Sequence, residues 1–198
     1  MNDSITRKLI LASTSVYRRE LLARLRLPFD VVASEVDEIP LPGEVPEHLA
    51  CRLAMLKART VARQFPACVV IGSDQVADLS GQALGKPLSH ERAVLQLQMM
   101  RGQTVVFQTA VAVVCDATGF AQVELAQVKV KFKKLSDQQI ERYLRAEMPY
   151  DCAGSAKSEG LGIALLEFID NDDPSALVGL PLIRTCQLLE AAGVQVLG

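Results

Sequence analysis

The sequence predicts an α/β protein in which helices flank a mixed, twisted sheet. Apolar runs of strand length alternate along the chain with longer segments of helical periodicity, which is typical of α/β folds. Residues 104–114 and 122–132 both resemble strands, and Asp116–Gly119 between them has the composition of a turn, so they predict an antiparallel hairpin. The chain has neither internal repeats nor a low-complexity linker. Strands interleaved with helices, together with one hairpin, favour a mixed sheet over a purely parallel one.

The first part of the chain is expected to contain three strands and two helices. The hydroxyl groups of Ser13, Thr14 and Ser15 supply N-cap candidates for the first helix, and leucines at helical spacing give the second helix an apolar stripe. An acidic turn and a Pro-rich loop separate the second strand from the second helix. In order, the elements are a strand over Lys8–Ala12, a helix over Ser15–Leu25, a strand over Phe29–Ala33, a helix over Glu47–Phe65 and a strand over residues 68–77.

The second part of the chain adds the hairpin and three helices. Ser136 and Gln139 have the spacing of a capping box, and Gly102 is expected to close the helix that precedes the hairpin. The apolar alternation slips between Leu125 and Val128, which predicts a β-bulge in the second arm of the hairpin. The expected elements are a helix over Ser89–Met100, strands over Thr104–Val114 and Gln122–Phe132, and helices over Ser136–Met148 and Pro181–Ala192.

Size and charge narrow the class of protein. The 198 residues suit one α/β domain spanning residues 1–198. A net charge of −2 argues against a general nucleic-acid binder, which usually carries a basic face. No apolar run approaches the ~18 residues of a membrane span, and the first residues lack a signal-peptide cleavage site, so we expect a cytoplasmic protein. The oligomeric state stays open at this stage, with a homodimer among the alternatives.

The cysteines predict neither a disulfide framework nor a zinc site. They are five in number and show no Cys-x-x-Cys spacing. Cys152 lies in a Gly-rich segment and has the chemistry of a nucleophile, but the chain has only two histidines to activate it. We therefore interpret the cysteines mainly as small core residues.

Asp74 is the most informative single residue. The expected strand over residues 68–77 is a continuous Val/Ile run that ends in Gly72, Ser73 and Asp74, as in strands covered on both faces. Ligands of open α/β sheets bind outside the carboxyl ends of strands, so Asp74 is expected to hold a metal ion or to activate a water molecule. The alternative is an aspartate that caps a turn, and this residue alone does not exclude it.

Further polar groups follow two other strands. The sequence Ser13-Thr14-Ser15 leads into a helix that carries Arg18 in its first turn, and a helix N-terminus favours anions such as phosphate. The turn after the second strand holds three carboxylates. Two carboxylates from neighbouring strand ends can hold Mg²⁺ together with substrate phosphates. A capped helix with a solvated arginine and a solvated acidic turn are the alternatives. The carboxylates are those of Glu35, Asp37 and Glu38.

Two Gly-rich segments complete the candidate chemistry. Gly81–Pro87 resembles a phosphate-binding P-loop, but its glycines are one residue too close and Pro87 replaces the required Ser or Thr, so a P-loop is rejected. Lys86 in this segment can still direct an ammonium group toward phosphate. The glycines of the segment 151–162 allow close approach to a ligand, and Glu159 places a carboxylate there.

Six short motifs, spread over nearly the whole chain and in the same order, resemble the signatures of the Maf family. The resemblance implies a nucleoside-triphosphate pyrophosphatase that uses a divalent metal cation, Mg²⁺ or Mn²⁺. It also implies a Maf/ITPase-like fold with two lobes around a cleft. The motifs are Ala12-Ser13-Thr14-Ser15 with Arg18-Arg19, Glu35-Val36-Asp37-Glu38, Gly72-Ser73-Asp74, Gly85-Lys86-Pro87, Ala153-Gly154-Ser155 and Val178-Gly179-Leu180-Pro181.

The same resemblance implies roles for individual residues around the phosphates. Asp74 corresponds to the catalytic carboxylate that accepts the proton of the attacking water, and Glu35 joins it in the metal site. A set of polar and basic residues corresponds to the groups that line the phosphate site. These residues are Ser13, Arg18, Lys57 and Lys86.

Base preference in the family follows three positions, occupied here by Tyr17, Gln75 and Glu159. Gln75 and Glu159 resemble the subgroup that hydrolyses 7-methyl-GTP. The base of 7-methyl-GTP is positively charged, so it can stack on an aromatic ring and pair with a carboxylate. Tyr17 and Val16 depart from the Trp and Pro expected there, which predicts looser selectivity. The alternatives are a pyrophosphatase for thymidine and uridine triphosphates, and a non-catalytic nucleotide-binding regulator of cell division.

Overall fold

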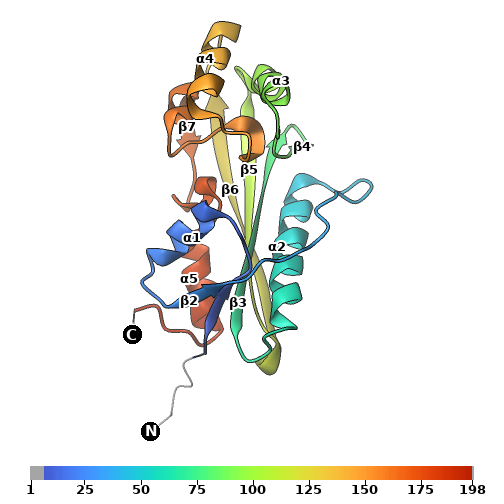
Figure 1. Cartoon of the computed structure of the whole chain (residues 1–198), viewed down its shortest axis with the longest axis vertical. Coiled ribbons are helices and arrows are strands. Elements are labelled where there is room, and N and C mark those ends of the chain that lie inside the picture. Colours follow the sequence, from blue (N-terminus) through green and yellow to red (C-terminus); the bar gives the residue numbers. More distant parts are fainter. Residues whose placement is uncertain (1–6, 198) are drawn as a thin grey trace.

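The computed structural model describes residues 7–197, which form one seven-stranded mixed sheet with helices on both faces (Figure 1). The strand order is β2-β1-β3-β5-β6-β7, and β4 pairs with β3. β1 is parallel to β2 and β3, whereas all the other pairings are antiparallel. The prediction of a mixed α/β sheet is therefore confirmed.

The strands and helices have the following bounds. The strands are β1 (Leu9–Leu11), β2 (Phe29–Val31), β3 (Val69–Leu79), β4 (Gln82–Leu84), β5 (Thr104–Cys115), β6 (Phe120–Phe132) and β7 (Leu166–Asp170). The helices are α1 (Val16–Ala23), α2 (Pro46–Ala62), α3 (His90–Met100), α4 (Asp137–Glu147) and α5 (Leu182–Ala191). Short 3₁₀ turns lie at Asp116–Thr118, Ala153–Ser155, Leu161–Leu165 and Ala176–Val178.

Serine hydroxyls begin three of these helices. Ser15, Ser89 and Ser136 each accept a hydrogen bond from a backbone amide in the first helical turn. The capping box of Ser136 and Gln139 is confirmed. Within residues 7–197, no helix has both the length and the apolar content needed to cross a bilayer.

The three long strands β3, β5 and β6 connect two lobes (Figure 1). At one end of the sheet, α2 packs on one face and α1 and α5 lie on the other. At the opposite end, α3 and α4 cover one face over the cluster that includes Leu97, Leu144 and Phe132. We call these ends the lower and the upper lobe. The two lobes share the sheet, so its long strands form the base of the space between them.

The predicted bulge in the hairpin is wrong. The pairing of β5 with β6 runs without a register shift from Thr104 opposite Lys131 to Cys115 opposite Phe120. The alternation of apolar residues along β6 slips because a different face of the strand is buried at each of its ends. Leu125 packs on the α2 face, whereas Ala126 belongs to the cluster on the opposite face, in the upper lobe. A register shift does occur in β6, but on its β7 side, at residues 131–132.

Asp74 lies in the middle of β3, not at the end of a strand as the sequence predicted. Pairing with β1 stops at Ile71, whereas pairing with β5 continues to Asp78. β3 therefore extends past the carboxyl end of its parallel neighbour, and Asp74 lies three residues beyond the last parallel pair. The expectation that Asp74 lies near the carboxyl end of a parallel strand holds, but that strand is β1.

Candidate functional site

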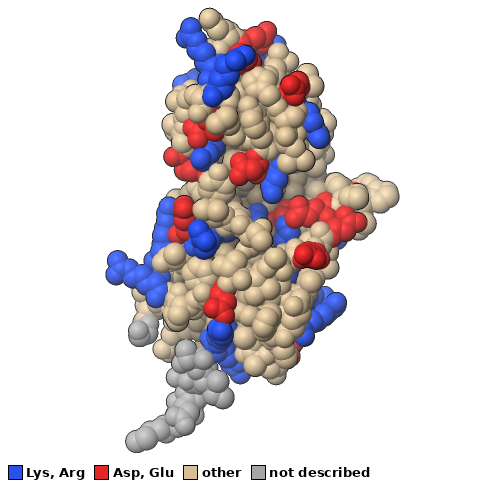
Figure 2. All heavy atoms as spheres, in the orientation of Figure 1, with Lys and Arg blue, Asp and Glu red and all other residues tan. Residues whose placement is uncertain are grey.

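A cleft of about 1150 Å³ lies between the two lobes, beside the part of β3 that has passed the end of β1. Figure 2 shows acidic and basic side chains next to one another around this hollow. Every residue that the sequence assigned to the site lines the cleft, so the structure brings together groups from six separate segments of the chain. They are Ser13, Tyr17, Arg18, Glu35, Lys57, Asp74, Gln75, Lys86 and Glu159.

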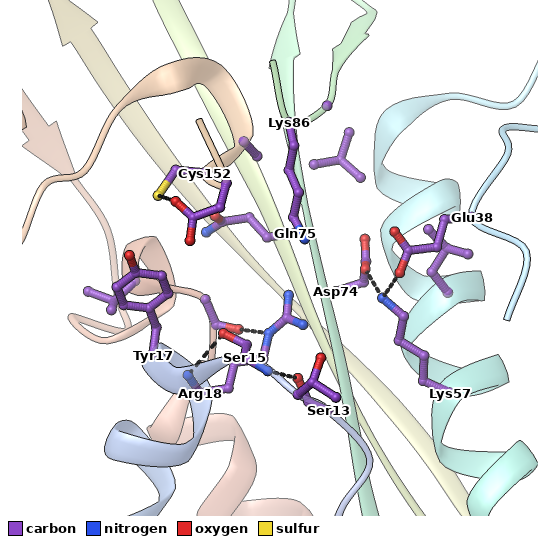
Figure 3. A pocket seen from close by; sticks show the side chains of 18 of the residues that line it. Ser13, Ser15, Tyr17, Arg18, Glu38, Lys57, Asp74, Gln75, Lys86 and Cys152 are labelled. Atoms are coloured by element: carbon purple, nitrogen blue, oxygen red, sulfur yellow. Dashed lines mark hydrogen bonds and ion pairs between the residues drawn. The ribbon is translucent and has the colours of Figure 1, made fainter. Parts of the chain in front are cut away.

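One end of the cleft contains a buried lysine between two carboxylates (Figure 3). Lys57 Nζ on α2 lies 2.5 Å from Asp74 Oδ1 and 2.6 Å from Glu38 Oε1. Lys57 and Asp74 are buried, whereas Glu38 reaches in from the loop after β2 and is half-exposed. Partial burial raises the pKa of Glu38, but the hydrogen bond from Lys57 and the charges of Lys57, Lys86 and Arg18 outweigh it and lower the pKa below its ordinary value.

Gly72 makes this ion pair geometrically possible. A Cβ atom on Gly72 would lie 2.3 Å from the carbonyl oxygen of Ala54 and 2.6 Å from the amide nitrogen of Ala58, both on α2. The absence of a side chain therefore lets the helix backbone lie directly on β3. Lys57 sits in the helical turn that passes over Gly72, so its side chain reaches Asp74 two residues further along the strand.

The start of α1 supplies the next groups. Ser13 Oγ accepts from the amide of Ser15, and Ser15 Oγ accepts from the amide of Arg18. Arg18 Nε donates to the carbonyl of Gly179 at 2.9 Å, which fixes the guanidinium between Tyr17 and Asp74 (Figure 3). Burial lowers the pKa of Arg18 from its ordinary value, against the opposing influence of Asp74 and Glu38.

The segment before α5 is fixed to the sheet by side chains of β3. Ser73 Oγ lies 2.9 Å from the carbonyl oxygen of Gly179, which also accepts from Arg18. Gly179 has a φ of +121°, a conformation that side chains disfavour. Gln75 Nε2 lies about 3.0 Å from the carbonyl oxygens of Ala176 and Leu177. The amide nitrogen of Gln75 is therefore engaged by protein groups, although the side chain lines the cleft.

Tyr17 and Cys152 lie at the other end of the cleft (Figure 3), and Glu159 lines the cleft close enough to influence the Cys152 thiol. Burial first, then the nearby charges of Asp151 and Glu159, raise the pKa of the Cys152 thiol to about 12. The thiol is thus protonated near neutral pH, so the structure disfavours Cys152 as a nucleophile. Lys157 Nζ lies 5.5 Å from the centroid of the Tyr17 ring.

Comparison with known proteins identifies the family. The sequence model described as Maf-like protein matches residues 8–192. The chain belongs to the Maf family. Proteins named 7-methyl-GTP pyrophosphatase are 73% identical in Albidiferax ferrireducens (100% of both chains covered) and 72% identical in a Polaromonas species (96% of this chain, 86% of the relative). The one from Methylobacillus flagellatus is 57% identical, covering 96% and 98%.

Similarity to solved structures is weaker. The Ham1 protein of Staphylococcus aureus matches with a TM-score of 0.48 and 16% identity, over 65% of this chain and 73% of that chain.

The sequence named Glu38 as one of three carboxylates in the acidic turn but assigned a role in the site only to Glu35. Both Glu35 and Glu38 of the Maf motif line the cleft, but the ion pair to Lys57 comes from Glu38. Asp37 between them turns away and accepts from the amide of Ile39. The acidic turn contained the signal for a carboxylate site. Spacing could not single out Glu38, because this segment forms neither helix nor strand.

The carboxylates of the cleft suit a cation that also binds the substrate. Within residues 7–197, no three His, Cys, Asp or Glu side chains form a cluster that could hold a metal ion by themselves. Asp74, Glu38 and Glu35 nevertheless line one cleft with oxygen donors. Mg²⁺ is commonly held by one or two carboxylates plus substrate phosphates, so this donor set fits such an ion and is a poor match for a structural zinc site.

Proposed function

We propose that this protein hydrolyses 7-methyl-GTP to 7-methyl-GMP and diphosphate. The observation that carries the proposal is the order of groups along one cleft. Tyr17 lies at one end, Asp74 with Lys57 at the other, and the Arg18 guanidinium between them (Figure 3). Glu159 also lines the cleft, near enough to Tyr17 and Cys152 for its charge to add to the effect of burial and raise the pKa of both. This order suits a nucleotide whose base lies at the Tyr17 end and whose phosphates extend from Arg18 to Asp74 and Lys57. The names of the relatives from Albidiferax and Polaromonas support the same substrate.

In the proposed reaction a water molecule attacks the α-phosphorus atom. The water oxygen bonds to phosphorus, the bond from phosphorus to the α,β-bridging oxygen breaks, and diphosphate leaves. Asp74 accepts the proton of the water as general base. Lys57 holds Asp74 through Oδ1. The other oxygen, Oδ2, has no hydrogen-bond partner among residues 7–197 and is the one we assign to the water.

The basic residues of the cleft bind the phosphates in this proposal. Arg18 is anchored through Nε to Gly179, which leaves its two terminal nitrogens for bidentate contact with a phosphate. Lys86 extends into the cleft from the segment after β4 and adds a point charge (Figure 3). The N-terminus of α1 and the Ser13 hydroxyl lie beside Arg18 and contribute further donors.

A divalent metal cation, Mg²⁺ or Mn²⁺, is the proposed cofactor. Asp74 with Glu35 or Glu38 would hold it, in agreement with the donor set of the cleft. When bound, such an ion neutralises phosphate charge and polarises the bond that breaks. Lys57 already links Asp74 to Glu38, so these two carboxylates are held close together before any ligand enters.

The selectivity for the base rests on charge. The base of 7-methyl-GTP is positively charged, and the face of Tyr17 can attract it. Glu159 can accept hydrogen bonds from the N–H groups of guanine and neutralise part of that charge. Gln75 contributes mainly by fixing residues 176–177 beside the base, since its amide nitrogen is engaged there.

Two other functions stay open to test: hydrolysis of thymidine and uridine triphosphates, and nucleotide binding without catalysis in a cell-division regulator. The deciding experiment offers 7-methyl-GTP, GTP, dTTP and UTP with Mg²⁺ or Mn²⁺ and measures diphosphate release. We expect 7-methyl-GTP to have the highest kcat/KM. Preference for dTTP or UTP would support the pyrimidine alternative. Tight binding of a nucleotide without diphosphate release would support the regulator.

We also retain the broader predictions made from the sequence. They are a single Maf-like domain over residues 1–198, a cytoplasmic location, and a nucleotide as ligand without nucleic-acid or membrane partners. A homodimer remains a prediction that sedimentation of the purified protein can test.

A further inference from the structure

The cleft residue Tyr17 is contacted by a cation that does not itself line the cleft. Lys157 Nζ lies 5.5 Å from the centroid of the ring, within the range at which an aromatic face attracts an ammonium group. Tyr17 lines the cleft, whereas the described residues that line it do not include Lys157. Lys157 therefore contacts a cleft-lining ring without itself being among the described residues that line the cleft.

Lys157 is held in this position by the upper lobe. Its Nζ lies 3.2 Å from Glu147 Oε1 at the end of α4, and Oε2 of Glu147 accepts from the amide of Leu161. The backbone amide of Lys157 donates to the hydroxyl of the buried Tyr143 at 3.0 Å. The hydrogen bond to Glu147 raises the pKa of Lys157, so the ammonium stays charged near neutral pH.

The contact with Tyr17 joins the two lobes across the base end of the cleft. Tyr17 belongs to α1 of the lower lobe, and Lys157 follows the 3₁₀ turn Ala153–Ser155, which packs against the upper lobe. The backbone after Lys157 folds back tightly, since a Cβ on Gly162 would lie 2.4 Å from the Lys157 carbonyl oxygen. Lys157 and Glu159 are therefore parts of one compact turn, in which Lys157 contacts the Tyr17 ring and Glu159 lines the cleft.

We propose that Lys157 is a positioning residue for the nucleobase: tethered by Glu147, it holds the Tyr17 ring so that the ring's cleft side is presented to the base. The proposal rests on the function proposed above, because it uses Tyr17 as the stacking surface. Lys157 acts only through Tyr17. Its removal should weaken binding of the base and leave the chemical step at the α-phosphate unchanged.

The test uses the product 7-methyl-GMP, whose dissociation constant can be measured by calorimetry without turnover. Lys157→Met keeps the length of the side chain and removes its charge. We expect it to raise the Kd by up to about 2–5-fold, because the strength of the cation–π contact is the upper limit of what positioning the ring can contribute, with kcat for 7-methyl-GTP unchanged. Lys157→Arg keeps the cation and should restore wild-type affinity. Lys129→Met, an exposed lysine of β6, is the matched control and should leave the Kd unchanged.

A double-mutant cycle with Tyr17→Ala decides whether Lys157 acts through the ring. We expect Lys157→Met to have no further effect on the Kd in the Tyr17→Ala background. An equal loss in both backgrounds, no loss at all, or the same loss in Lys129→Met would overturn the proposal. Failure of the proposed function gives a different result: the wild-type protein would release no diphosphate from 7-methyl-GTP, whatever the Kd values show.

Discussion

Replacing Lys57 by methionine tests the centre of the site most directly. Methionine fills a similar volume without the charge, so the substitution removes the partner of two carboxylates and leaves packing on α2 nearly intact. Asp74 is buried and has Lys57 as its only side-chain partner among residues 7–197. In the variant, the Asp74 carboxylate would stay buried and lose its ion-pair partner.

The structure gives the expected size of the effect. Breaking a buried ion pair from one side costs about 3–5 kcal/mol, because the remaining charge stays desolvated. Glu38 is half-exposed and its pair with Lys57 adds only about 0–1 kcal/mol. Most of the loss should therefore come from Asp74. For a chain of this length, a free energy of 3–5 kcal/mol corresponds to a fall in Tm of about 6–20 °C.

Urea and thermal unfolding without nucleotide or metal measure this loss independently of activity. The informative control is Lys57→Met combined with Asp74→Asn, which removes the uncompensated charge. We expect the double variant to be more stable than Lys57→Met alone. Ordinary surface substitutions change the free energy of unfolding by no more than about 0.5 kcal/mol. If Lys57→Met changes it as little as that, the buried ion pair is not present in solution and the reasoning fails.

The remaining predictions concern turnover, measured as diphosphate release. Asp74→Asn should lower kcat by about 10²–10⁴-fold in a protein that still unfolds cooperatively, and near-normal turnover would remove Asp74 from the mechanism. Arg18→Lys and Lys86→Ala should lower kcat/KM for every triphosphate, and a loss confined to one base would contradict phosphate binding. Glu159→Gln should lower kcat/KM for 7-methyl-GTP by about 10–100-fold and affect pyrimidine triphosphates less, whereas a uniform loss would place Glu159 in the catalytic machinery. Tyr17→Ala should act in the same direction, and Tyr17→Trp should keep or improve activity; the opposite order would exclude stacking.

Local chemistry explains what the sequence predicted well. Ser15 and Ser136 cap helices where the sequence placed helix starts, because capping depends on residues only three positions apart. Most cleft residues belong to, or directly adjoin, a short polar motif beside an apolar element, whereas Lys57 lies inside the apolar helix α2. Those motifs could be recognised one at a time. Their convergence in one cleft followed from the family resemblance, since no single motif carries that information.

The predictions that were wrong or incomplete concern features that depend on residues distant in the sequence. The length of β3 past Asp74 is set by pairing with β5, about 35 residues later, and cannot be read from β3 itself. The slip at Leu125 was interpreted as a bulge because the sequence does not show that different helices cover opposite faces at the two ends of β6. β4 and β7 were not expected, and β4 has only three residues. Such short segments give almost no periodic signal.

The contribution of Gly72 to the site depends on α2, which lies outside the Gly72-Ser73-Asp74 motif. The sequence places Gly72 two residues before Asp74, where it could serve a turn or a bound ligand. In the structure it instead admits the backbone of α2, with Ala54 and Ala58 against the strand. An alanine at position 72 would have to displace the helix, because the obstructing atoms are backbone atoms that no rotamer change can move. The motif therefore supplies two things: the carboxylate of Asp74 for the chemistry, and a glycine that lets Lys57 come within ion-pair distance of that carboxylate. The role of the glycine follows only from the packing of α2 on β3, which the motif alone does not show.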